Sequence, residues 1–128
     1  MVVKGYHHAH LVSENPETTA QWYVKALGGE ITGQTEGKGS ISITMKVGEV
    51  SLAVRGLRPN ETTPEDNDFP ALGIHHFGLI VDDIEGALQL WVDAGGEMLE
   101  PAHLGTSGNI VAFVRGPENV MIEFLQPK

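Results

Sequence analysis

The fold is decided by two similar stretches of sequence, GYHHAHLV at residues 5–12 and GIHHFGLI at residues 73–80. The two stretches begin at an offset of 68, and further matches follow at the same offset, as with Tyr23 and Trp91. A match of this length, with its members in the same order, predicts that the chain contains an internal duplication.

Each copy predicts the same succession of a strand, a helix and three further strands. Alternating apolar residues between turn-forming residues indicate the strands, and helical spacing of apolar residues indicates the helices. We expect strands at roughly 5–12, 30–35, 40–47 and 49–55 in the first copy, and at roughly 73–81, 97–101, 109–115 and 119–126 in the second.

Capping residues mark the two helices. Asn15 and Asp83 stand where an N-cap is expected, and glycines follow the last apolar residues of each helix at Gly28 and Gly95. The stretch Arg58–Ala71, with three prolines and four acidic residues, is typical of a linker. We therefore predict a single domain over residues 1–128.

The predicted domain has three parts. Module one spans residues 1–57, the linker spans 58–72 and module two spans 73–128.

Alternation along the strands predicts which side chains face away from the helices. In the first copy Ala9 and Leu11 belong to the core, so His8 and His10 lie on the opposite face. In the second copy the same reasoning places His76 on that face, together with one acidic residue of the last strand.

That acidic residue is Glu123, which stands between the apolar Ile122 and Phe124. A carboxylate in such a strand is costly unless a partner or a cation satisfies it. His8, His76 and Glu123 are therefore predicted to hold one divalent metal, because two imidazoles and a carboxylate leave coordination positions open for substrate. The alternative is that each His is a hydrogen-bonded structural residue, but its matched placement in both copies favours the metal site. The predicted fold class is α+β, with two tandem βαβββ modules forming a cupped mixed sheet around a metal cleft.

The composition of the 128 residues excludes several classes of function. The net charge is −9 without a cluster of Lys or Arg, so nucleic acid is not an expected partner. The sequence contains no cysteine, which excludes disulfides and thiolate ligands. It has no apolar run that could span a membrane and no leader segment, so we expect a cytoplasmic protein.

These paired modules, each opening with a His before an alternating apolar strand, resemble the vicinal oxygen chelate superfamily. That superfamily includes glyoxalase I, methylmalonyl-CoA epimerase, extradiol ring-cleaving dioxygenases, and the bleomycin and fosfomycin resistance proteins. The resemblance covers nearly the whole chain apart from the linker. It implies that His8 is the first ligand, that His76 is the ligand opening the second module, and that Glu123 is the terminal carboxylate.

The sequence departs from the family at positions that bear on the reaction. Glyoxalase I and the epimerase take a further Glu or Gln from the last strand of module one, where this chain has Ala53. The remaining three-ligand set resembles the extradiol dioxygenases, which hold Fe(II) with two His and one Glu. Those enzymes also use an acid–base His near residues 50–52 and a Tyr near residues 112–114, and both are replaced here. His10 is the candidate catalytic base, and it is also an alternative first ligand.

We therefore expect a metal-dependent enzyme acting on a small vicinal-oxygen substrate, dioxygenase-like by its ligand set. The favoured metal is Fe(II) or Mn(II), with Zn(II), Ni(II) or Co(II) as alternatives. The alternative functions are a glyoxalase I- or epimerase-type lyase or isomerase, and a drug-binding resistance protein without catalysis. Arg55 and His103 are candidate substrate-binding residues, the latter in a glycine-rich loop over residues 103–108. We expect a homodimer, as family members commonly pair their modules.

Overall fold

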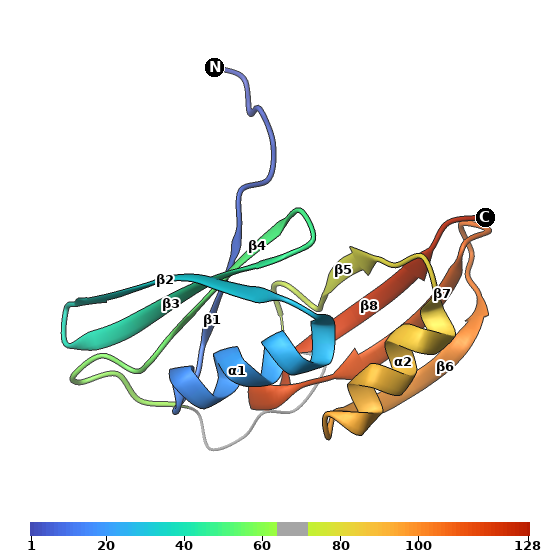
Figure 1. Cartoon of the computed structure of the whole chain (residues 1–128). Helices are drawn as coiled ribbons and strands as arrows, with labels where there is room; N and C mark the ends of the chain where they lie inside the picture. Colours follow the sequence, from blue (N-terminus) through green and yellow to red (C-terminus); the bar gives the residue numbers. More distant parts are fainter. Residues whose placement is uncertain (64–71) are drawn as a thin grey trace. The chain divides into compact units, whose positions relative to one another are not determined.

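A computed structural model describes residues 1–63 and 72–128, so part of the predicted linker lies outside the described residues. The chain divides into two compact units, Met1–Thr62 and Thr63–Lys128. Each unit holds one of the predicted modules (Figure 1). Each is described by itself below.

The first unit is a βαβββ module with a four-stranded mixed sheet. Its strand order is β1-β4-β3-β2, in which β1 runs parallel to β4 and the other neighbours are antiparallel. Its elements are β1 (Ala9–Val12), α1 (Pro16–Leu27), β2 (Glu30–Gly37), β3 (Ser40–Val47) and β4 (Val50–Arg55).

The second unit repeats this plan in the order β5-β8-β7-β6, again with one parallel pair, β5 and β8. Its elements are β5 (Phe77–Ile80), α2 (Ile84–Asp93), β6 (Glu97–Leu104), β7 (Ile110–Arg115), a 3-10 turn (Pro117–Asn119) and β8 (Met121–Gln126). The predicted α+β class with two tandem βαβββ modules is confirmed.

Strand register shows that the two sheets are built alike. Ala9 pairs with Leu52 in the first sheet, and Phe77 pairs with Ile122 in the second. Because Ala9 and Phe77 are matched by the sequence repeat, their partners are matched as well. The residue after each partner is then also matched, so Ala53 is the structural counterpart of Glu123.

The helix N-caps predicted from the sequence are present, whereas α2 ends at Asp93 with Ala94 as its C-cap, ahead of the predicted end at Gly95. The Asn15 side chain accepts a hydrogen bond from the Thr18 backbone N–H at 3.1 Å, and the Asp83 side chain accepts one from Gly86 at 3.1 Å. Helix α1 ends at Gly28, whose φ of 70° lies in the left-handed region that glycine tolerates. The two helices therefore begin in the same way.

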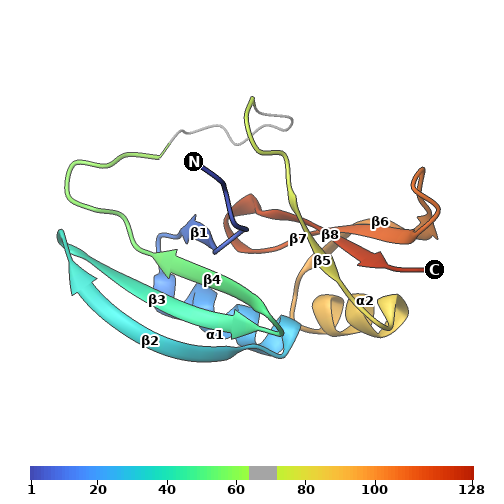
Figure 2. The same cartoon turned by 90° about the horizontal axis from the view of Figure 1, so that it is seen from above.

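Each helix covers one face of its own sheet and builds the core there (Figure 2). Tyr23 of α1 and Trp91 of α2 are fully buried at matched positions. The Trp91 ring meets Phe124 edge-on, with centroids 5.6 Å apart, and its Nε1 donates a hydrogen bond to the Arg115 carbonyl oxygen. Such aromatic pairs contribute beyond the area that they bury.

The first strand of each module is shorter than predicted. The expected strands at 5–12 and 73–81 begin only at Ala9 and Phe77. The partner strands account for part of this difference, because the register would place Val50, the first residue of β4, opposite His7, and Met121, the first residue of β8, opposite His76. Residues further upstream have no neighbouring strand of their own sheet to pair with.

Among the described residues, no helix is long and apolar enough to cross a membrane.

Candidate metal centre

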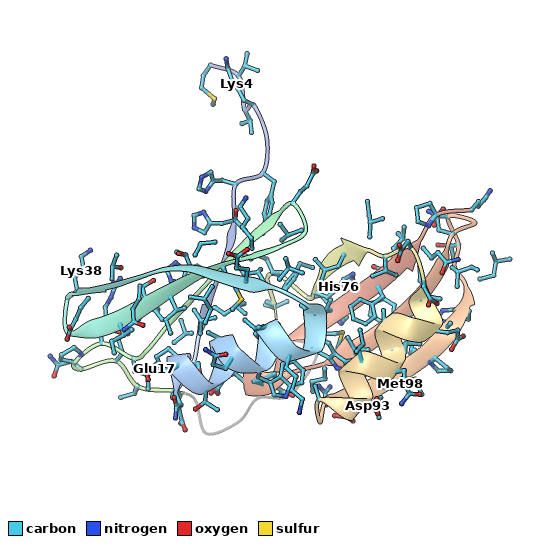
Figure 3. The ribbon with its side chains drawn as sticks, viewed as in Figure 1. Lys4, Glu17, Lys38, His76, Asp93 and Met98 are labelled. Atoms are coloured by element: carbon cyan, nitrogen blue, oxygen red, sulfur yellow. The ribbon has the colours of Figure 1, made fainter. Side chains whose placement is uncertain are left out.

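Two of the three predicted ligands lie in contact within the second unit. His76 directly precedes β5, and Gly78 of β5 is paired with Glu123 of the central strand β8. Nε2 of His76 lies 2.9 Å from Oε2 of Glu123. Both side chains are partly buried, with exposed fractions of 29% and 21% (His76 is labelled in Figure 3). The prediction that these residues share a face is consistent with this contact.

The neighbours of this pair are apolar or small. Phe113 is paired with Glu123 across β7 and β8, and its ring meets the His76 ring edge-on with centroids 5.0 Å apart. On the other side Gly78 leaves space beside the carboxylate, because a Cβ there would meet only the Glu123 carbonyl oxygen within 4 Å. Phe113 therefore supports the His76 ring from one side.

A second histidine contacts His76 on its other ring nitrogen. Nδ1 of His75 lies 2.8 Å from Nδ1 of His76. The first unit repeats this contact, with Nδ1 of His7 2.7 Å from Nδ1 of His8. The sequence reasoning identified the repeated His pair but not the hydrogen bond within it.

The first unit carries His10 at the position that corresponds to Gly78. His10 is paired with Ala53 on the neighbouring strand β4, and its ring centroid lies 6.0 Å from that of His8. The pKa of His10 is lowered, first by partial burial and then by the nearby His8, Arg55 and Arg58. This direction favours the neutral imidazole, which is the form that accepts a proton.

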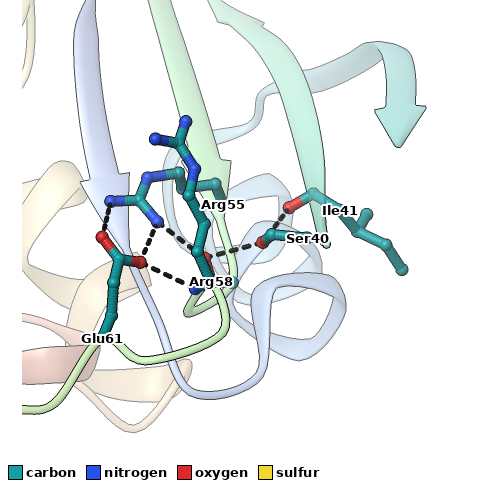
Figure 4. Close-up of polar contacts among 6 residues, drawn as sticks. Ser40, Ile41, Arg55, Arg58 and Glu61 are labelled. Carbon is teal, nitrogen blue, oxygen red and sulfur yellow. Dashed lines mark hydrogen bonds and ion pairs between the residues drawn. The ribbon is translucent and has the colours of Figure 1, made fainter. Parts of the chain in front are cut away.

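Arg55 lies at the end of β4 and is held by Glu61 through two parallel hydrogen bonds (Figure 4). Nη1 and Nη2 of Arg55 donate to the two carboxylate oxygens over 2.6 and 3.0 Å, and the Arg58 backbone N–H donates to Oε1 over 2.7 Å. These hydrogen bonds lower the pKa of Glu61 to about 2, and the bonding to Arg55 is the largest cause. The sequence reasoning missed this partner because it assigned Glu61 to a solvated linker.

His103 lies in a strand and not in the predicted loop. Strand β6 continues to Leu104, and His103 is paired with Val111 of β7. Its side chain is exposed, and its Nδ1 lies 2.8 Å from the Pro101 carbonyl oxygen. The expected glycine-rich loop therefore begins only after β6.

Comparison with known families decides the classification. The model of the Glyoxalase/Bleomycin resistance protein/Dioxygenase superfamily matches residues 5–124. The chain belongs to this superfamily. The resemblance inferred from the two His-containing strands is confirmed.

Solved structures of the superfamily have the same fold. A glyoxalase family protein from Enterococcus faecalis is 26% identical with a TM-score of 0.78, over 98% of this chain and 99% of that chain. A glyoxylase/bleomycin resistance protein/dioxygenase domain from Frankia sp. EAN1pec is 17% identical with a TM-score of 0.82, over 99% and 100%. The fosfomycin resistance protein FosX from Mesorhizobium loti is 12% identical with a TM-score of 0.72, over 97% and 92%. No curated protein matches the chain.

The superfamily includes both enzymes and binding proteins without catalysis, and its members often bind divalent metals. In the parts of the chain that the structure describes, no group of three or more His, Asp or Glu side chains is gathered closely enough to hold a metal. His76 and Glu123 belong to the second unit and His8 to the first, so the grouping of all three stays a prediction.

The His76 and Glu123 pair nevertheless suits a metal. Nε2 of His76 and Oε2 of Glu123 lie 2.9 Å apart, so one ion could contact both atoms. Neutral imidazole and carboxylate are also the donor types of the facial triad that holds Fe(II).

Proposed function

We propose that this chain is a metal-dependent enzyme that acts on a small substrate with two neighbouring oxygen atoms. His8, His76 and Glu123 hold one divalent metal, with Fe(II) or Mn(II) favoured. The observation that carries the proposal is the 2.9 Å contact between His76 and Glu123, on the sheet face away from α2. A carboxylate in a largely apolar strand is energetically costly unless it has a partner, and a bound cation would be such a partner.

The other candidate residues have separate roles in this proposal. When bound, the metal supplies a Lewis acid that polarises the substrate oxygens. His10 accepts a proton from the substrate, for which its lowered pKa keeps it neutral. His103, exposed on β6, contacts the substrate.

Arg55 binds a carboxylate of the substrate. Its guanidinium already receives the Glu61 carboxylate in the two-bond geometry that arginine offers to such a group. A substrate carboxylate would therefore take the place of Glu61.

The ligand set favours a dioxygenase over the other reactions of the superfamily. Ala53 stands at the counterpart of Glu123 and cannot act as the fourth protein ligand that glyoxalase I uses. A lyase or isomerase of the glyoxalase or epimerase type is the second candidate, in line with the name of the Enterococcus relative. A drug-binding resistance protein without catalysis is the third.

Metal analysis of purified protein and of three variants tests this proposal. We expect bound metal in the wild type, its loss in His76→Ala and Glu123→Ala, and its retention in Glu30→Ala, which removes an exposed carboxylate on β2. Oxygen uptake with catechols then separates the dioxygenase from the lyase or isomerase. Full metal occupancy in His76→Ala would refute the ligand assignment.

We also propose that the chain forms a homodimer. The exposed apolar side chains of Val2, Val3 and Tyr6 ahead of β1 support this, because a partner would cover them. Light scattering at micromolar concentration should give twice the monomer mass, and a clean monomer mass would refute the dimer.

A further inference from the structure

The His pair at the start of each module has the same geometry twice. The Nδ1 atoms lie 2.7 Å apart between His7 and His8, and 2.8 Å apart between His75 and His76. The ring centroids are 5.0 and 5.1 Å apart, with interplanar angles of 85° and 81°.

The residues that flank the two pairs differ. Tyr6 and Ala9 surround the first pair, whereas Ile74 and Phe77 surround the second. The pair geometry therefore recurs although the residues directly before and after the two pairs differ.

We propose that His7 and His75 are positioning residues, which hold the hydrogen of the neighbouring ligand on Nδ1 and so leave its Nε2 to bind the metal. This inference rests on the proposed function. It adds a role for two histidines that face away from the metal, and it assigns the ligating atom of His8 and His76.

The chemistry follows from the two nitrogens of the ring. A neutral imidazole carries one N–H and one lone pair, so a ring that binds a metal through Nε2 must carry its hydrogen on Nδ1. That hydrogen needs an acceptor, and metal-binding histidines usually have one. Nδ1 of His75 lies in the acceptor position for His76, and Nδ1 of His7 lies in it for His8.

The Glu123 contact places a hydrogen on Nε2 of His76 in the metal-free protein. A carboxylate only accepts hydrogen bonds, so Nε2–H of His76 donates to Oε2 of Glu123. In the neutral form of His76, Nδ1 then has no hydrogen and accepts the hydrogen bond from Nδ1–H of His75.

With a metal on Nε2, His76 would carry its hydrogen on Nδ1. His75 would then accept that hydrogen bond on its own Nδ1 and carry its hydrogen on Nε2. The pair holds two hydrogens before and after, so the change is an exchange of tautomers.

Zn²⁺ affinity of matched variants tests the role of the hydrogen bond. His75→Phe keeps an aromatic ring but removes the acceptor, and it should weaken Zn²⁺ binding about 10–100-fold in calorimetry. His75→Asn keeps an acceptor oxygen near the Nδ1 position and should recover most of the affinity. His7→Phe and His7→Asn should behave in the same way, with melting temperatures of the metal-free variants close to the wild type because both histidines are exposed.

Nitrogen-15 spectra of the imidazole rings give a second readout, which needs no activity. We expect His76 to carry its hydrogen on Nε2 in the metal-free wild type and on Nδ1 with Zn²⁺ bound. Zn²⁺ bound through Nδ1 of His76 would overturn the inference, and so would unchanged affinity in both Phe variants. If Zn²⁺ binding depends on His76 and Glu123 but not on His7 or His75, the proposed function stands and only the positioning role fails. A wild type that binds no metal overturns both.

Discussion

The two modules carry three matched positions in a row, one on each of three neighbouring strands. The first module fills this row with Thr44, Ala53 and His10, and the second fills it with Phe113, Glu123 and Gly78. The backbone register is the same, but the ionisable side chain stands on the edge strand in one module and on the central strand in the other. The two modules thus share their strand register but differ in the side chains at the matched positions. Each module can therefore serve as a control for the other.

The modules are expected to differ most in how much the free energy of unfolding falls when a matched core residue is replaced. Phe124 and Val54 occupy matched, fully buried positions, but only Phe124 meets a tryptophan ring. We expect Phe124→Ala to lower the free energy of unfolding by about 3–5 kcal/mol, and Val54→Ala by about 2 kcal/mol. Urea denaturation of both variants measures this. Equal losses would show that the aromatic pair adds nothing to the second core.

A carboxylate placed in the first module tests whether position 53 faces the proposed metal site, as its counterpart Glu123 is proposed to do. Ala53→Glu copies the acid of the second module onto its matched position, next to His10. Because residue 53 is buried, we expect the metal-free variant to be destabilised by about 1–3 kcal/mol. We also expect tighter Zn²⁺ binding, because the new carboxylate adds a fourth ligand to two imidazoles and one carboxylate. Activity on substrates that need two open positions on the metal should fall.

Calorimetry and thermal melting of the same variant check both effects. Lower stability without a change in Zn²⁺ affinity would mean that position 53 does not face the ligands, although it is matched in register to Glu123.

The helix caps are a place where the modules should respond alike. The side chains of Asn15 and Asp83 each accept one backbone hydrogen bond at 3.1 Å. Asn15→Ala and Asp83→Ala should each lower the free energy of unfolding by about 1 kcal/mol. Added salt should reduce the effect only for Asp83, whose charge interacts with the helix dipole. The same salt dependence in both variants would contradict this.

The smallest effect concerns the ion pair between Arg55 and Glu61 in the first module. Arg55 contacts Glu61, whereas its matched position in the second module is Leu125. The pKa of Glu61 is lowered from 4.5 to about 2, so the pair stabilises the folded state above pH 4.5 and loses this effect as the pH falls through 2. Carbon-13 titration of the Glu61 carboxyl should show this value, and Arg55→Gln should return it toward 4.5. An unchanged midpoint in Arg55→Gln would show that Arg55 is not the cause.

Local features of the sequence predicted much of the fold. Asn15, Asp83 and Gly28 define helix ends through bonds to their immediate neighbours, so their roles could be inferred without the tertiary structure. The repeat at residues 5–12 and 73–80 then required that both halves have the same plan, and both do.

What escaped prediction depends on partners far along the chain. The first possible pairing position of β1 depends on where β4 begins, and the length of β6 depends on its pairing with β7, which placed His103 in a strand. At the candidate site, strand alternation placed His76 and Glu123 on one face. It could not predict that Phe113 packs on the His76 ring, since the two are neighbours only through the register of three strands.

Strand β6 has one more consequence, for how copies of the protein behave in concentrated solution. It is an edge strand of its sheet, and its register against β7 shifts between Met98 and Glu100 and again between Glu100 and His103. Pro101 lies within the second shift. Proline has no N–H to offer to a further strand, and a bulged strand presents an uneven edge. An edge of this kind is a poor template for another chain, so pairing of copies along the β6 edge is disfavoured.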